Sequence, residues 1–243
     1  MTFRSLSRSS AVLIFVIFAA NNWAATYNPA SDFEAGFTSH TNPNGVWSYG
    51  YSSSFTNPIT LFDRTVQPGL DSANEQLWLS SSVNIGDSPA VELNNGPAFN
   101  DGNVSASAGE LLLVAGIGGQ YADLVFTAPS TGTYSLSGSF IGSQVNIGTF
   151  VGVVANGSTV FNSTVTSEGQ IVPFSDTVSL LAGNTVVFSV GPDGGLQNTG
   201  LSLTISPGTA TPEPSSIALL SVGTPIALII AFFRTRKREV VNS

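Results

Sequence analysis

The chain has 243 residues, enough for one domain of moderate size or two small ones. Its 42% of hydrophobic residues can form a core, which excludes disorder throughout, and the absence of cysteine excludes disulfides, thiolate metal sites and a cysteine nucleophile. Residues 26–207 hold one arginine and thirteen acidic residues, a formal charge of −12. A field of that sign repels phosphate backbones, so we predict no nucleic-acid partner.

Residues 1–25 have the organisation of a secretory signal peptide. Arg4 and Arg8 form a positive n-region, residues 11–20 form an apolar h-region, and small residues offer a cleavage site near Ala24 or Ala25. An uncleaved anchor is the alternative, but an apolar run of ten residues is too short to span a bilayer comfortably. We therefore expect the protein to be exported.

Residues 26–206 are predicted to form one all-β domain. Candidate strands lie at 46–51, 59–62, 76–80, 90–93, 111–115, 121–128, 132–140 and 199–205, with hairpins at 150–162 and 177–191. In 132–140, apolar residues alternate with threonine and serine, the period of a strand with one buried face. Asn156-Gly157 is typical of a type I′ turn. Strands at this spacing indicate an antiparallel β-sandwich, jelly-roll-like, with a barrel as the alternative.

Aromatic residues in two of these strands are candidates for carbohydrate binding. Trp47, Tyr49 and Tyr51 alternate along one strand, so their rings project from the same face. On an exposed face they would form a platform for sugar rings, and on the other face they would fill the core. Ser48 and Gly50 suit an outer face, which favours the core. In the strand at 76–80, two leucines suit the core and place Trp78 outside.

Two loops offer oxygen ligands for a metal ion. Asp101, Asn103 and Ser105 occupy alternate positions, a pattern that can coordinate Ca²⁺, and Asp193 lies in a second loop. The same residue types are ordinary turn formers, which is the favoured interpretation. No cofactor is otherwise predicted.

The C-terminal residues 207–238 combine a short motif, an apolar run and a basic tail. Pro212 and Pro214 hold Glu213 in an extended segment that can enter an enzyme cleft. Residues 217–233 carry no charge and would span about 26 Å as a helix, enough for a thin bilayer. The run is followed at once by cations that are expected to remain cytoplasmic, namely Arg234, Arg236, Lys237 and Arg238.

The order of these three parts, in TPEPSSIALLSVGTPIALIIAFFRTRKR, closely resembles the PEP-CTERM sorting signal of Gram-negative bacteria. The resemblance implies that an exosortase, a membrane enzyme, removes the tail. It also implies that the protein is anchored in the inner membrane before processing. Afterwards it would reach the cell surface or the extracellular matrix, in association with exopolysaccharide and biofilm.

The preceding domain shows a looser resemblance. The segments NPNGVWSYGY, LVFTAPSTGTYSLSGSF and LLAGNTVVFSVG are similar in pattern to β-sandwich domains that often precede such tails, and those domains look like non-catalytic carbohydrate-binding modules. The resemblance implies a binding or structural role at exopolysaccharide. The alternative is a secreted glycosidase, which would need a pair of carboxylates, and the sequence favours no particular pair.

Overall fold

The structure is a computed structural model that describes residues 26–145, 148–192 and 198–208. The predicted signal peptide, Asp193, the Pro-Glu-Pro motif, the membrane span and the basic tail lie outside these residues. The described part contains these elements: α1 (Pro29–Ser39), β1 (Trp47–Ser52), β2 (Thr60–Leu61), β3 (Arg64–Val66), β4 (Glu75–Leu79), β5 (Ala90–Asn94), β6 (Phe99–Asn100), β7 (Ser105–Ala106), β8 (Leu111–Val114), β9 (Tyr121–Thr127), β10 (Gly132–Gly142), β11 (Thr149–Ala155), β12 (Ser158–Val165), β13 (Ile171–Leu180), β14 (Thr185–Pro192) and β15 (Asn198–Pro207).

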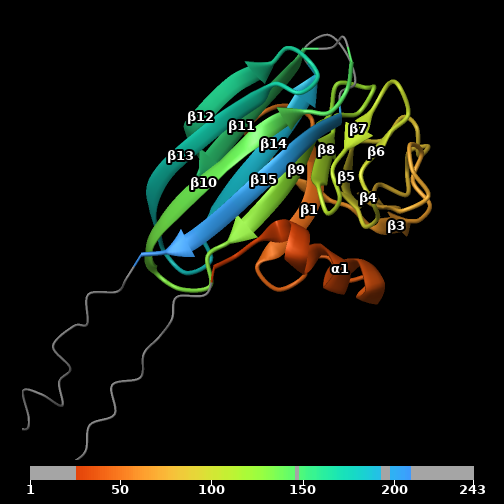
Figure 1. The fold of residues 1–243 in the computed structure, drawn as a ribbon. Coiled ribbons are helices and arrows are strands. Elements are labelled where there is room, and N and C mark those ends of the chain that lie inside the picture. Colours follow the sequence, from red (N-terminus) through yellow and green to blue (C-terminus); the bar gives the residue numbers. More distant parts are fainter. Residues whose placement is uncertain (1–25, 146–147, 193–197, 209–243) are drawn as a thin grey trace, which may run out of the picture.

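Two antiparallel sheets pack face to face, which confirms the predicted sandwich (Figure 1). The six-stranded sheet has the order β12-β11-β14-β9-β1-β2, and the seven-stranded sheet has the order β13-β10-β15-β8-β5-β4-β3. Strands β6 and β7 form a small separate hairpin. The predicted tight turn is also present, since Asn156 and Gly157 have φ angles of 48° and 78°, as a type I′ turn requires.

The core lies between the sheets and is rich in aromatic rings. Phe126 of β9 packs against Trp47 at a centroid separation of 5.4 Å and against Tyr134 at 5.6 Å. Phe174 and Phe188 extend this packing toward β13 and β14. The chain has no cysteine, so the sandwich is held without disulfides, and burial of these rings and the aliphatic side chains around them stabilises it.

Helix α1 was not predicted from the pattern of apolar residues. Its signal is local, because Asn28 caps the helix by accepting hydrogen bonds from the backbone of Ala30 and Ser31, and Pro29 begins the first turn. The helix packs on one end of the sandwich through Phe33, which is fully buried. The indole of Trp47 donates a 2.9 Å hydrogen bond to Asp32 and fastens the helix to β1.

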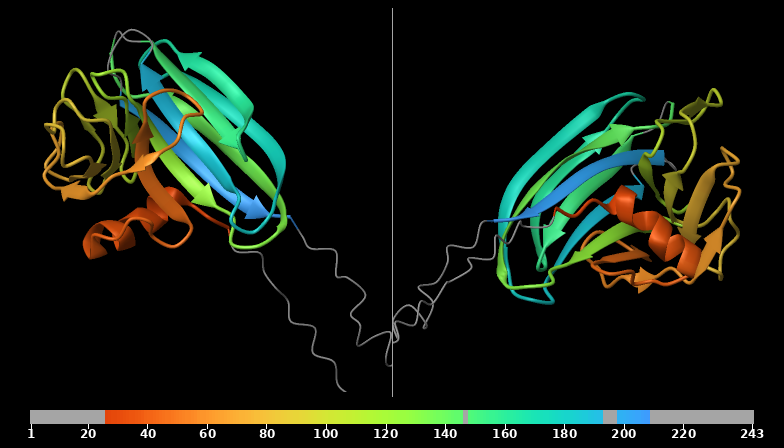
Figure 2. Two further views of the ribbon diagram at one scale, coloured as in Figure 1. Left: turned by 180° about the vertical axis from the view of Figure 1, so that it is seen from behind. Right: turned by 60° about the horizontal axis from the view of Figure 1, so that its bottom comes forward.

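The two ends of the described domain lie side by side (Figures 1 and 2). Tyr27 and Ile205 exchange two backbone hydrogen bonds of 2.8 and 3.0 Å. Segments attached before residue 26 and after residue 208 therefore leave from the same end of the sandwich.

Candidate functional site

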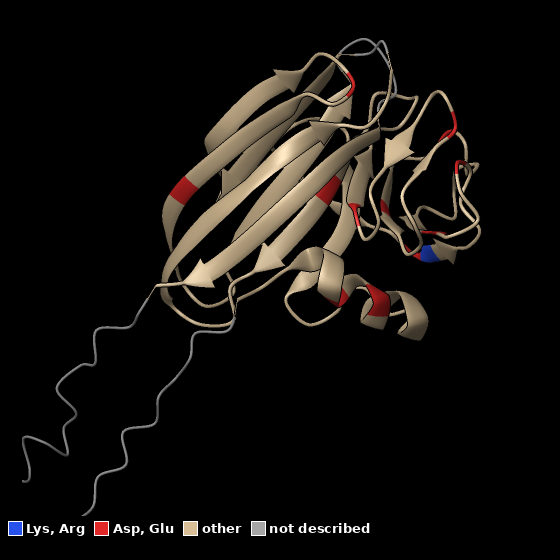
Figure 3. Cartoon of the chain, viewed as in Figure 1, with Lys and Arg blue, Asp and Glu red and all other residues tan. Residues whose placement is uncertain are grey.

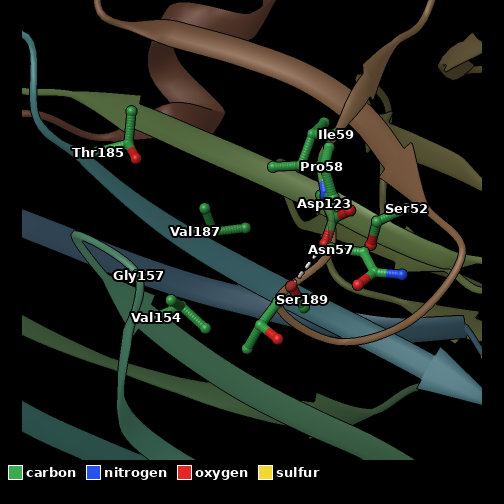
Figure 4. Close-up of a pocket in the computed structure, with 11 residues that line it drawn as sticks. Ser52, Asn57, Pro58, Ile59, Asp123, Val154, Gly157, Thr185, Val187 and Ser189 are labelled. Atoms are coloured by element: carbon green, nitrogen blue, oxygen red, sulfur yellow. Dashed lines mark hydrogen bonds between the residues drawn. The ribbon is translucent and has the colours of Figure 1, made fainter.

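A cleft of about 300 Å³ lies on the outer face of the six-stranded sheet (Figure 4). Side chains of β1, β9, β14 and β11 form its floor, and the loop 53–59 covers one side. The inward side chains of β9 are Ala122, Leu124 and Phe126. Strand alternation therefore turns Tyr121 and Asp123 to the outer face. We call this feature the sheet-face cleft.

Asp123 is the buried acid at the floor of the sheet-face cleft. It pairs with Gly50 of β1 and Ser189 of β14, and its side chain is 1% exposed. The hydroxyl of Ser189 donates a hydrogen bond to Oδ1, whereas Oδ2 has no hydrogen-bond partner. Burial raises the pKa of Asp123 to about 6, and the nearby hydroxyls of Ser189 and Ser52 oppose that rise.

Three partly exposed aromatic side chains, Phe55, Tyr121 and Phe150, lie next to the cleft on the same sheet face, and we call them the aromatic trio. Phe55 contacts Phe150 edge-on at a centroid separation of 4.8 Å, and Tyr121 lies 5.9 Å from Phe150 and 6.4 Å from Phe55. Two glycines make room for these rings. A Cβ at Gly152 would lie 2.6 Å from the Phe55 ring, and one at Gly191 would lie 2.0 Å from Tyr121.

The predicted aromatic platform is not on the surface. Trp47 and Tyr49 are at most 1% exposed, and Tyr51 is partly buried against Phe62 at a ring separation of 5.7 Å. The core interpretation of this strand is the one observed. Trp47 and Tyr49 stabilise the sandwich and offer no face to a sugar, and Tyr51 packs against the same core.

The prediction that Trp78 points outward is wrong. Trp78 is 2% exposed and stacks on Tyr49 inside the sandwich, with a centroid separation of 5.9 Å and an interplanar angle of 9°. The alternation of residues along this strand gave a wrong prediction because both faces of β4 are covered. Leu77 and Leu79 pack with Ala90 in a second apolar cluster on the other face of the sheet.

The suggested calcium ligands do not converge on one point in the described residues. Asp101 accepts backbone hydrogen bonds of 2.8 Å from Asn103 and Val104, which is the geometry of a turn. The hydroxyl of Ser105 donates to Glu168 instead. Asp193 lies outside the described residues, so calcium binding stays a prediction. Across the described ranges, no group of three or more histidine, cysteine or acidic side chains is arranged to hold a metal.

A second set of buried acids lies on the outer face of the seven-stranded sheet, away from the sheet-face cleft. Glu75 and Glu92 are 1% and 7% exposed, and Asp71 accepts a 3.1 Å hydrogen bond from Asn198. Burial is the main cause that raises the pKa of all three carboxyls. The backbone amides of Asp71 and Ser72 donate to Glu75 and partly offset this effect.

Sequence reasoning missed Asp123 and the aromatic trio. A signal for Asp123 was present, since an acid in the middle of the predicted strand 121–128 must either face solvent or carry a function.

No helix in the described part of the chain is both long and apolar enough to cross a membrane.

Comparisons with known proteins find similarity in structure only. No family model and no curated protein matches the chain. A family 35 carbohydrate-binding module from Clostridium thermocellum is similar over 54% of this chain and 87% of its own, with 17% identity and a TM-score of 0.28. A family 4 module covers 60% of this chain and 96% of its own, with 17% identity and a TM-score of 0.34.

A third similar structure, a GH26-CBM35 β-(1,4)-mannanase from Podospora anserina, covers 52% of this chain and 29% of its own, with 17% identity and a TM-score of 0.31. At these scores the matches identify neither a ligand nor a reaction for this chain.

Proposed function

We propose that the domain binds glycan without catalysis, through the sheet-face cleft and the aromatic trio. The observation that carries this proposal is the placement of three partly exposed rings beside a cleft with a polar floor, on one sheet face. Aromatic faces stack on the C–H faces of sugar rings, and the floor offers oxygens to sugar hydroxyls. Selective retention on a polysaccharide is the direct test.

The floor of the cleft favours binding over the glycosidase alternative. Asp123 is the one acid among the described residues that line the cleft. Glycoside hydrolysis by the usual route needs two carboxyl groups, about 5 to 9 Å apart, on opposite sides of the bond. A single acid can orient a sugar through its hydroxyls but does not supply that pair.

Removing Tyr121 and Phe150, the two rings of the aromatic trio that stand on strands, is expected to abolish retention of the domain on polysaccharide. In Tyr121→Ala/Phe150→Ala the stacking surface is lost, and we expect affinity to fall at least about tenfold, as for a binding hot spot. Affinity electrophoresis in gels containing exopolysaccharide measures the change.

The matched control for this double variant is Phe37→Ala, which removes a partly buried ring from α1. It should migrate like the wild type in the same gels. Wild-type retention in the double variant, with an unchanged melting temperature, would assign glycan binding to another surface or to none.

We also propose that the protein is exported, sorted by an exosortase through Pro212, Glu213 and Pro214, and delivered to the surface or matrix. The geometry of the domain is compatible with a tether after residue 208. Strand β9 runs from Tyr121 to Thr127, and β10 begins at Gly132, near the pair of Tyr134 with Pro207. Tyr121 thus lies at the end opposite the chain exit, about 20 Å away along the strand. The aromatic trio would then lie at the end of the domain that is distant from the membrane.

Replacing Glu213 with alanine is expected to block processing. The variant should keep its C-terminal tail and accumulate in the inner-membrane fraction, because the extended acidic motif would no longer fit the sorting enzyme. Immunoblots of fractionated cells show the difference in size and location. A variant that is processed like the wild type would remove Glu213 from the recognition motif.

A further inference from the structure

Asp123 is a buried acid that has no cationic partner in the described ranges of the chain. Its Oδ1 is held by the hydroxyl of Ser189, the hydroxyl of Ser52 lies close enough to lower its pKa, and its Oδ2 has no partner in hydrogen-bonding geometry. Among the described residues Arg64 is the only lysine or arginine, and it lies on β3, at the edge of the other sheet (Figure 3). A buried carboxylate is stabilised by a paired cation. Because the described residues supply no cation beside Asp123, a cationic ligand can take that role.

We propose, on the basis of the glycan-binding function above, that the preferred glycan carries free amino groups. The ligand class is a polysaccharide of amino sugars that is at least partly deacetylated. Its ammonium group would pair with Oδ2 of Asp123, while a neighbouring sugar ring stacks on Tyr121 and Phe150, the two rings of the aromatic trio that stand on strands. The ion pair and its charge-assisted hydrogen bond set the preference over neutral glycans.

The negative charge of the domain also favours a glycan that carries ammonium groups. The described residues carry twelve acids and one arginine. An acidic glycan would meet this field and the Asp123 carboxylate without any cation in the cleft lining. A glycan with ammonium groups is attracted by the field at long range and neutralises the carboxylate on contact.

The geometry of β9 brings the two contacts into register. Tyr121 and Asp123 are two residues apart on the outer face, which is about 7 Å along the strand. One sugar unit can therefore contact the ring while the next reaches the acid. The electron-rich face of Tyr121 also attracts an ammonium group that lies over it.

Access to Oδ2 requires the loop 53–59 to move aside. Asn57 makes its backbone and side-chain hydrogen bonds within the loop, to Ser54 and Ser53. Packing of Phe55 on Gly152 and of Ile59 on Gly50 holds the loop on the sheet. Displacement therefore breaks these packing contacts and leaves the sheet ladder intact.

A pair of hexasaccharides that differ only in acetylation tests the proposal. The affinities of the full chain for chitosan hexamer, fully deacetylated, and for chitin hexamer, fully acetylated, are measured by calorimetry at low salt and about pH 6, near the pKa of Asp123. We expect the deacetylated hexamer to bind about tenfold more tightly, the scale of a partly buried ion pair. Added salt should reduce this ratio.

Two variants test whether Asp123 causes the preference for the deacetylated hexamer. Asp123→Asn keeps the shape of the side chain and removes its charge, and it should bring the affinity ratio close to one. Glu34→Gln removes the same charge from an exposed position on α1 and should keep the wild-type ratio. Melting curves confirm that both variants are folded.

The outcomes separate the two proposals. If the wild type binds the acetylated hexamer as tightly as the deacetylated one, the amino-sugar preference is wrong and glycan binding stands. If it binds neither hexamer nor any polysaccharide tested, the proposed function itself fails. If hexalysine binds as tightly as the deacetylated hexamer and the ratio survives in Asp123→Asn, the attraction is a general effect of the acidic surface and the cleft assignment is overturned.

Discussion

Replacing Trp78 with alanine is expected to destabilise the domain by about 3 to 5 kcal/mol, the usual cost of deleting a large buried aromatic side chain. Trp78 is 2% exposed and stacks on Tyr49 in the middle of the sandwich. The substitution leaves a cavity between two sheets, which cannot close because both are held by their hydrogen-bond ladders. Urea unfolding monitored by circular dichroism measures the loss.

Two further variants serve as controls for the stability measured for Trp78→Ala. Trp78→Phe should cost less, because it keeps a stacking ring and removes an indole N–H that has no hydrogen-bond partner. Leu181→Ala, at a side chain that is 63% exposed, should change stability by no more than about 0.5 kcal/mol. A Trp78→Ala protein as stable as the wild type would contradict the packing described here. Loss of glycan retention in that variant would report unfolding and not a sugar contact.

The strands could be predicted from the sequence because each carries its own pattern. In β10, Tyr134, Leu136 and Phe140 are buried as the alternation predicts, and the closing strand buries Leu201 and Leu203. Local turn chemistry placed the β11–β12 hairpin correctly. The predicted hairpin at 177–191 is wrong, because β13 and β14 are joined by a turn but belong to different sheets. Periodicity is a property of one segment, so it needs no knowledge of the sheet order.

The candidate site depends on that sheet order and could not be predicted. Phe55 is in a loop, Tyr121 is on β9 and Phe150 is on β11, and only the sequence of strands β11-β14-β9-β1 brings them together. Alternation also fails where both sides of a strand are covered, as at Trp78. The reason is that loops after β3 and β4 shield a face that a simple sandwich would expose.

The buried carboxyls predict an inverted pH dependence of stability. Asp71, Glu75, Glu92 and Asp123 have raised pKa values, chiefly because burial disfavours their charged forms. Between the unfolded and folded pKa values the native state binds more protons than the unfolded chain. The free energy of unfolding therefore falls as pH rises through this window.

Asparagine at position 123 is expected to remove a large part of this dependence. The pKa of Asp123 rises from 3.8 to about 6, so its protonation accounts for about 3 kcal/mol that is fully present below the unfolded pKa and is lost as pH rises through about 6. Near pH 4 the wild-type carboxyl is already neutral in the native state, and Asp123→Asn should be nearly as stable as the wild type. Above about pH 7 it should be more stable by up to that amount.

Glu92→Gln provides an independent check on the seven-stranded sheet, because the pKa of Glu92 is also well above its usual range. Urea titrations from about pH 4 to pH 8 should show a shallower slope for each variant and the shallowest slope for the double variant, since the two carboxyls lie on different sheets and their effects add. Asp63 and Asp101 act in the opposite sense, because hydrogen bonds lower the pKa of each. Their contribution is lost only as pH falls through these lowered pKa values, below the window of the buried acids. A wild-type protein whose stability rises from pH 4 to pH 8 would contradict this prediction, because it would show that these buried carboxyls are ionised in the native state.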